Sequence, residues 1–139
     1  MKLTSVQRNP RVALIFWTPV LIWMGFIFLL SSIPGNKLPE IPVPNVHKMV
    51  HFAEYSILGA LFIRAFLNTK GEVKAAKLVI ITLAVISVFA LSDEWHQKFV
   101  TDRSADISDS LTDVVYSAIG IYFYFRTKRL FSGRGLKNA

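Results

Sequence analysis

The stretch Val12–Leu30, "VALIFWTPVLIWMGFIFLL", runs for nineteen residues without a charged side chain. A helix of about 20 such residues crosses the hydrocarbon core of a bilayer, which is about 30 Å thick. The whole chain is also apolar, since 53% of its 139 residues are hydrophobic and its mean hydropathy is +0.43. A soluble domain of this size would not hide that much apolar surface, so we predict a single integral membrane unit.

The same stretch could serve as a signal peptide, because the basic residues Lys2, Arg8 and Arg11 precede it. However, nineteen apolar residues are long for that role, and no clear small-x-small cleavage pattern follows them. We therefore expect a retained transmembrane helix, in which Pro19 is tolerated and can produce a kink.

Three more apolar segments follow, and each is long enough for a membrane helix. A proline-rich stretch separates the first two, because closely spaced prolines resist helix formation. The sequence predicts an all-α fold, a polytopic four-transmembrane-helix bundle that forms one domain over residues 1–139. The expected elements are helices over about 12–30, 46–67, 75–92 and 105–125 and a flexible tail over about 130–139.

The charges are distributed unevenly over the two sides of such a bundle. With four spans, the two termini and the loop after the second span share one side of the membrane. That side carries twelve of the sixteen basic residues and, among the acids, only Glu72. Basic residues accumulate in cytoplasmic loops, so we predict that both termini are cytoplasmic.

The composition also excludes some classes of function. The chain has no cysteine, which rules out disulfides and thiolate chemistry. Its net charge of +7 would suit a nucleic-acid partner, but the cytoplasmic bias of basic residues explains the charge better. We expect membrane lipids or a lipid-linked envelope component as partners, and no nucleic acid.

Polar side chains gather where the predicted helices reach the outer side. In the second helix His47 and His51 are four residues apart, and Glu54 and Tyr55 follow on neighbouring turns. Glu54 lies well inside the apolar segment. An ionisable residue at that depth normally faces a partner or a wet cavity.

The fourth helix carries three acids, Asp106, Asp109 and Asp113, at spacings of three and four residues. This spacing puts them on one face, which we expect to point into the bundle. The first two lie near the helix start, where the helix dipole favours anions. Asp113 lies deeper, and it needs a cation, a hydrogen-bond donor or its own proton.

The third helix ends in the polar sequence "SDEWHQKF". If the helix continues through it, Asp93 and Gln97 share a face and Glu94 lies beside them. Arg103 follows, shortly before the fourth helix. We expect Glu94 and Gln97 to face a pocket, whereas His96 can equally be a surface residue.

These residues leave three kinds of chemistry open. They could bind a ligand, act as a histidine–carboxylate acid and base, or form a structural salt-bridge network. Two histidines four residues apart could also hold Zn²⁺, but "HKMVHFAE" lacks the glutamate of an HExxH site, and we expect no metal and no cofactor. Ser31 and Ser32 show no nucleophile-elbow pattern.

Three motifs in this order resemble the VanZ-like family of small bacterial membrane proteins. They are "SSIPG" after the first helix, "KMVHFAEYSILGALF" in the second, and "SDEWHQKFVTDRSADISDSLTDVVYSAIG" across the third and fourth. The resemblance covers roughly residues 26–125. It implies an envelope role in the bacterial cytoplasmic membrane and a link to glycopeptide resistance of the teicoplanin type. It does not imply a particular reaction.

The chain departs from the family pattern at three positions. Asp113 stands where an asparagine is usual, Tyr116 where a first glycine is common, and Asn45 where an acid often precedes the lysine. We expect Asp113 to make the inner pocket more acidic. We expect Tyr116 to loosen close helix packing.

The sequence therefore predicts a polar outer-leaflet pocket that binds an envelope amphiphile or its headgroup. The alternatives are a membrane enzyme acting on a lipid-linked substrate, with candidate catalytic residues His51, Glu54 and Glu94, and a structural or partner-binding module. The pocket is predicted to be lined by Lys48, His51, Glu54, Tyr55, Asp93, Glu94, Gln97, Arg103, Asp109 and Asp113.

Overall fold

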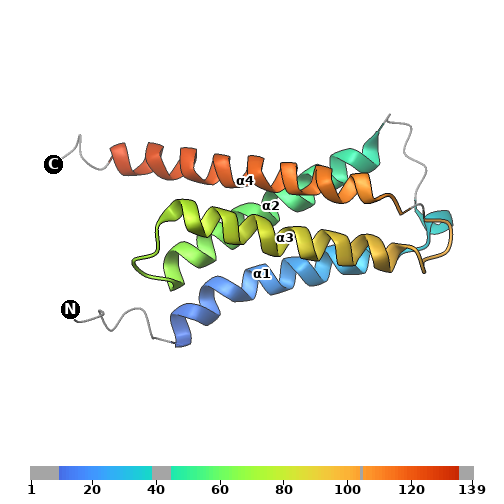
Figure 1. Ribbon diagram of the computed structural model, residues 1–139, viewed down its shortest axis with the longest axis horizontal. Helices are drawn as coiled ribbons and strands as arrows, with labels where there is room; N and C mark the ends of the chain where they lie inside the picture. The colour runs from blue at the N-terminus through green and yellow to red at the C-terminus, as the bar shows by residue number, and fades with distance from the viewer. Residues whose placement is uncertain (1–9, 39–44, 104, 135–139) are drawn as a thin grey trace.

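The computed structural model describes residues 10–38, 45–103 and 105–134, with side chains as far as Leu130. Within these ranges the chain is helical and contains no strand. Figure 1 shows the elements in chain order: α1 (Pro10–Ser31), the short 3₁₀ helix η2 (Gly35–Lys37), α2 (Val46–Thr69), α3 (Ala75–Gln97) and α4 (Ile107–Arg134). The prediction of four long helices is confirmed.

α3 and α4 extend well beyond the ends that the apolar pattern predicts. α3 continues through the polar sequence to Gln97, because the Nε2 of Gln97 donates to the Oδ2 of Asp93 one turn earlier, at 3.0 Å. α4 continues to Arg134, and the basic residues in its last turns suit the negative end of the helix dipole. The predicted tail is thus helical as far as residue 134, and residues 135–139 lie outside the described residues.

The surface of the bundle is suited to a membrane. α1, α2 and α3 are each long and apolar enough to cross one. Large apolar side chains cover the outside of the bundle; Leu14, Ile22, Leu29, Ile80 and Val88 are each more than 60% exposed. Exposed apolar surface on this scale marks an integral membrane protein. α4 as a fourth span remains a prediction, because both its ends carry charges.

The core forms around α2, which packs against α1, α3 and α4. Tyr55, Leu58 and Ile63 of α2 are fully buried, and Val20 of α1 and Ile86 of α3 pack in the same core. The indole N–H of α1 residue Trp23 donates to the backbone carbonyl of Glu54 at 2.9 Å. This bond fixes α1 against α2 at the depth of the polar residues.

α2 and α4 approach each other closely because two glycines lie at their contact. A Cβ on Gly59 would lie 2.3 Å from the backbone oxygen of Ser117, and a Cβ on Gly120 would lie 1.8 Å from that of Ser56. Small residues allow such backbone contact between membrane helices. Tyr116 does not prevent this close contact, since its backbone carbonyl accepts a hydrogen bond from the hydroxyl of Ser56 at 3.1 Å. That its side chain loosens the packing relative to a glycine stays a prediction.

The polar segments meet at one end of the bundle. Figure 1 shows the end of α1, helix η2, the start of α2, the end of α3 and the start of α4 together at one end. The start of α1, the turn between α2 and α3 and the end of α4 lie at the opposite end. We call the first of these the polar end. Its location on the outer side of a membrane remains a prediction.

We predict that Gly120→Ala lowers stability, because the new methyl group must push the backbones of α2 and α4 apart. Overpacking of this kind typically costs about 1–3 kcal/mol. Gly25→Ala is the matched control, since a Cβ there has nothing within 4 Å. Thermal unfolding in detergent, followed by circular dichroism, should show a lower melting temperature for Gly120→Ala alone. Equal melting temperatures of the two variants would contradict the close packing.

Candidate functional site

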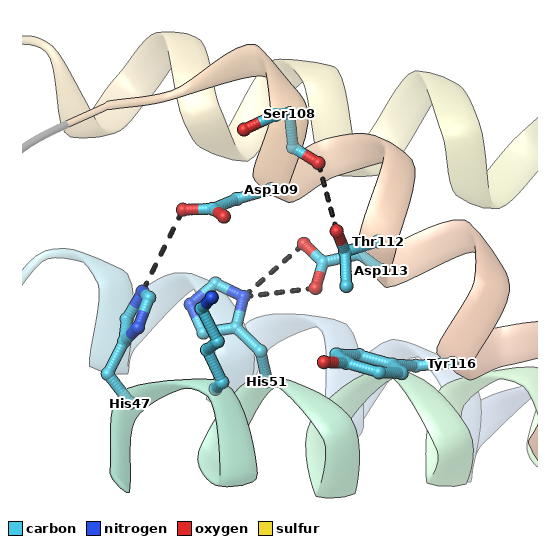
Figure 2. A pocket seen from close by; sticks show the side chains of 8 residues that line it. His47, His51, Ser108, Asp109, Thr112, Asp113 and Tyr116 are labelled. Atoms are coloured by element: carbon cyan, nitrogen blue, oxygen red, sulfur yellow. Dashed lines mark hydrogen bonds and ion pairs between the residues drawn. The ribbon is translucent and has the colours of Figure 1, made fainter. Parts of the chain in front are cut away.

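A histidine–aspartate pair joins α2 to α4 at the polar end. The Nδ1 of His51 lies 3.0 Å from Oδ1 and 3.3 Å from Oδ2 of Asp113 (Figure 2). The two side chains are only 12% and 2% exposed. An ionised carboxylate can only accept, so Nδ1 carries the proton and Nε2 is left for another partner. The partner that Asp113 needs at this depth is therefore His51.

A second, looser pair lies one turn closer to the end of the bundle. The Nε2 of His47 is 3.9 Å from Oδ2 of Asp109, and these side chains are 52% and 27% exposed. The rings of His47 and His51 lie side by side, with centroids 4.8 Å apart. The two pairs form a ladder between α2 and α4 (Figure 2). Its outer pair is open to solvent and its inner pair is nearly closed.

Two cavities flank the histidines. The first, which we call the α2–α4 cavity, has a volume of about 170 Å³ and is lined by His47, Lys48, His51, Ser108, Asp109, Thr112, Asp113 and Tyr116. The second, the α1–α2 cavity, has a volume of about 280 Å³ and is lined by Leu30, Ser31, Leu38, Val46, His47, Val50, His51, Glu54 and Arg103. His47 and His51 form part of the wall of both.

Arg103 is held in the α1–α2 cavity by the end of α1. Its Nε donates to the backbone carbonyl of Ile33 at 3.1 Å, and its Nη2 donates to that of Leu30 at 2.9 Å. A guanidinium at a helix C-terminus is also favoured by the helix dipole. No carboxylate of the described ranges forms an ion pair with Arg103. Its charge is therefore available to a ligand oxygen.

Gly35 explains how the segment carrying Arg103 comes to lie across the end of α1. The backbone N–H of Gly35 donates to the carbonyl of Thr101 at 3.0 Å. A Cβ at Gly35 would lie 1.8 Å from the backbone oxygen of Asp102. Only a glycine permits this approach, so the residue after the "SSIP" sequence sets the position of the turn before α4.

The end of α3 forms a buried polar network. Its α3 residues line neither cavity, while its α1 partner Ser31 lines the α1–α2 cavity. The Oδ2 of Asp93 accepts hydrogen bonds from the hydroxyl of Ser31 at 2.8 Å and from the Nε2 of Gln97 at 3.0 Å. The Oε2 of Glu94 accepts the backbone N–H of Asp106 at 2.9 Å. These bonds fasten α3 to the end of α1 and to the start of α4. Glu94 and Gln97, predicted to face a pocket, are buried in this packing.

Asp106 caps the start of α4. Its Oδ1 accepts the backbone N–H of Ser108 at 2.9 Å. This hydrogen bond lowers the pKa of the Asp106 carboxyl below its ordinary value, because it favours the charged form. Asp106 therefore lies at the helix start, as predicted, but its side chain is exposed and does not point into the bundle.

Glu54 and Tyr55 differ in their surroundings. Glu54 is 7% exposed and lines the α1–α2 cavity, but it makes no hydrogen bond to His51, which is paired with Asp113 instead. Tyr55 is fully buried beneath His51, and its hydroxyl has no partner among the described residues. The histidine–carboxylate pair in the bundle is therefore formed with α4, and not within α2.

The predicted site residues thus fall into three groups. The α2–α4 cavity is lined by Lys48, His51, Asp109 and Asp113. The α1–α2 cavity is lined by His51, Glu54 and Arg103. The remaining four are packed outside both cavities: Tyr55, Asp93, Glu94 and Gln97. Among the lining residues absent from the predicted set are Ser31 and Tyr116. The "SSIP" motif pointed to the first, but no pattern pointed to the second.

Two further side chains at the polar end have partners of their own. His96 is half-buried, stacks on the ring of Phe28 at 4.4 Å and lies 3.0 Å from the hydroxyl of Ser32. It therefore packs against α1 rather than meeting only water. In the part of the chain that the structure describes, no group of three or more histidine, aspartate or glutamate side chains could hold a metal ion.

The chain matches the model of a known protein family. The family model described as VanZ/LLP1 matches residues 16–131, which is most of the chain. No curated protein and no solved structure matches it. The family and the apolar helices together indicate a bacterial membrane protein. The chain belongs to the VanZ/LLP1 family.

Proposed function

We propose that this protein binds the headgroup of an envelope amphiphile at its polar end, in the outer leaflet of the bacterial cytoplasmic membrane. The observation that carries the proposal is the mixed lining of the α1–α2 cavity. Arg103, Glu54 and His51 supply charged and polar groups, while Leu30, Leu38, Val46 and Val50 supply an apolar wall. Ligand sites commonly combine an apolar lining with a few convergent polar groups, and an amphiphile presents both kinds of surface.

The charges of the two cavities favour a headgroup with both signs of charge or with many hydroxyls. A guanidinium binds phosphate or carboxylate oxygens through two parallel hydrogen bonds. Arg103 supplies such a group in one cavity, and Lys48 supplies an ammonium in the other. Glu54 and Asp109 would accept hydrogen bonds from an amine or a sugar hydroxyl. A zwitterionic or glycosylated amphiphile satisfies more of these groups than a simple anion does.

The outer-leaflet location rests on the charge distribution and on α4 as a fourth span. α4 has 28 residues, which correspond to about 42 Å at 1.5 Å per residue, and its middle from Val114 to Phe125 is uncharged. With four spans the basic ends of the helices lie in the cytoplasm, and the polar end faces outward. An outward-facing headgroup site is also compatible with a link to glycopeptide resistance.

We predict that His51→Gln reduces the amount of envelope lipid that copurifies with the protein by about tenfold, because His51 lines both cavities. Mass spectrometry of the purified protein measures the bound lipid. His96→Gln is the matched control, since His96 lies at the same end of the bundle but lines neither cavity. Equal lipid content in the two variants, with both still folded, would contradict the proposal.

A second candidate function is acid–base catalysis on a lipid-linked substrate. The observation that favours it is the His51–Asp113 pair, in which a carboxylate holds Nδ1 and leaves Nε2 for a reacting group. In this function His51 acts as the base, Asp113 orients it, and Glu54 is the carboxyl group that shares a cavity with it. Glu94 is the weaker candidate acid, because its Oε2 is bonded to the backbone of Asp106.

For this second function we predict that Asp113→Asn lowers turnover of extracted envelope lipids by about 10²–10⁴-fold, since general acid–base catalysis contributes about that much. Lipid binding should change much less. Chromatography and mass spectrometry of lipids incubated with the purified protein measure turnover. If the wild-type protein converts none of these lipids, this candidate function is wrong while the binding function stands.

A further inference from the structure

An apolar groove lies on the outer surface of the bundle between α2 and α4. We call it the α2–α4 groove; its volume is about 360 Å³. Its floor consists of the small residues Ser56, Ala60 and Gly120, and large side chains such as Phe52 and Phe123 form its walls. The groove exists because the helices meet at Gly120 and Ser56, where no bulky side chain fills the contact line.

The groove continues the α2–α4 cavity along the same pair of helices. The cavity is lined by residues within 47–51 of α2 and 108–116 of α4. The groove is lined by residues within 52–60 of α2 and 120–127 of α4. Tyr116 lines the cavity and Phe52 lines the groove, and their rings meet edge to face with centroids 5.1 Å apart. Figure 2 shows the hydroxyl of Tyr116 on the side of His51. This ring pair therefore lies at the junction between a polar and an apolar compartment.

We propose that the α2–α4 groove binds the acyl chain of an amphiphile whose headgroup occupies the α2–α4 cavity. This inference rests on the proposed function and deepens it, since it names the part of the ligand that lies below the headgroup. A molecule with one polar and one apolar end matches a polar cavity that runs into an apolar groove. A helix from another protein would fill the groove but leave the charges of the cavity without a partner.

The size and surroundings of the groove suit one hydrocarbon chain. From Phe52 to Ala60 the groove follows α2 for about 12 Å, at 1.5 Å per residue. That is less than half of a hydrocarbon core of about 30 Å, so a chain held there stays within the membrane. Phe52 and Phe123 are 42% and 58% exposed on the outer surface of the bundle, where membrane lipids can enter from the side.

The charges of the cavity indicate a compact zwitterionic headgroup. Among the described residues Lys48 forms no ion pair, and Asp109 is paired only loosely, at 3.9 Å from His47. A phosphate can therefore approach Lys48 while an ammonium approaches Asp109. Asp113 is already engaged by His51. The ligand class is thus a phosphate-bearing amphiphile with an amine, such as a phosphoethanolamine lipid, with one chain in the groove.

The test compares tetradecanoyl and hexanoyl lysophosphatidylethanolamine as probes, titrated into the full-length protein in detergent and followed by native mass spectrometry. We expect the long-chain probe to bind the wild type more tightly, because each buried methylene contributes about 0.8 kcal/mol. Ala60→Phe, which fills the floor of the groove, should weaken the long-chain probe by about tenfold and abolish this chain-length dependence. Ala118→Phe, an exposed position of α4 outside the groove, should change neither.

Two further variants separate the possible failures. Phe123→Ala removes a wall of the groove at an exposed position, so it tests the inference without adding bulk, and it should also weaken the long-chain probe. Lys48→Gln should weaken both probes alike. If the probes bind and His51→Gln weakens them, but Ala60→Phe and Phe123→Ala match the wild type, the acyl groove is wrong and headgroup binding stands. If neither probe binds the wild type, both proposals fail for this class of lipid.

Discussion

The structure depends on one constraint, which is the cost of leaving an ionised group without a partner at membrane depth. Asp113 is engaged by His51, the Oδ2 of Asp93 by Ser31 and Gln97, and Arg103 by two backbone carbonyls of the α1 end. These bonds cross between helices, so the same contacts that satisfy the charges also hold the polar ends of the helices together. The buried Oδ1 of Asp93 has no hydrogen-bond partner among the described residues.

The polar residues fall into two groups, those buried in helix packing and those that line the cavities. Asp93, Glu94 and Gln97 are buried in packing, and this part of the chain fits the structural role that the sequence left open. Lys48 and Arg103 have no carboxylate partner among the described side chains, and the Nε2 of His51 has none of its own. These groups line the two cavities. A candidate site differs from a structural network because some of its charged and polar groups remain able to bind a ligand.

Much of the fold follows from the apolar pattern, but the pairing inside the site does not. The apolar runs identified all four helices, and the change to polar residues after Ser92 suggested an end to α3 that the Asp93–Gln97 hydrogen bond prevents. His51 and Asp113 are 62 residues apart in sequence. Their contact depends on the rotation of α2 against α4, which the glycine contacts at Gly59 and Gly120 determine. The spacing of residues in one helix cannot reveal that rotation, so one pocket was predicted where two cavities lie.

The central claim is that the polar end binds an amphiphile headgroup around His51. Photo-crosslinking tests it most directly, with a lysophosphatidylethanolamine that carries a diazirine on its headgroup and with the protein in native membranes. The account predicts that mass spectrometry finds the label on residues that line the two cavities around His51. These are residues 47–51 of α2 together with 108–116 of α4 in the α2–α4 cavity, or with Leu30, Ser31 and Arg103 in the α1–α2 cavity. Label spread over the exposed apolar faces of α1 and α3, around Ile22 and Ile80, would contradict it.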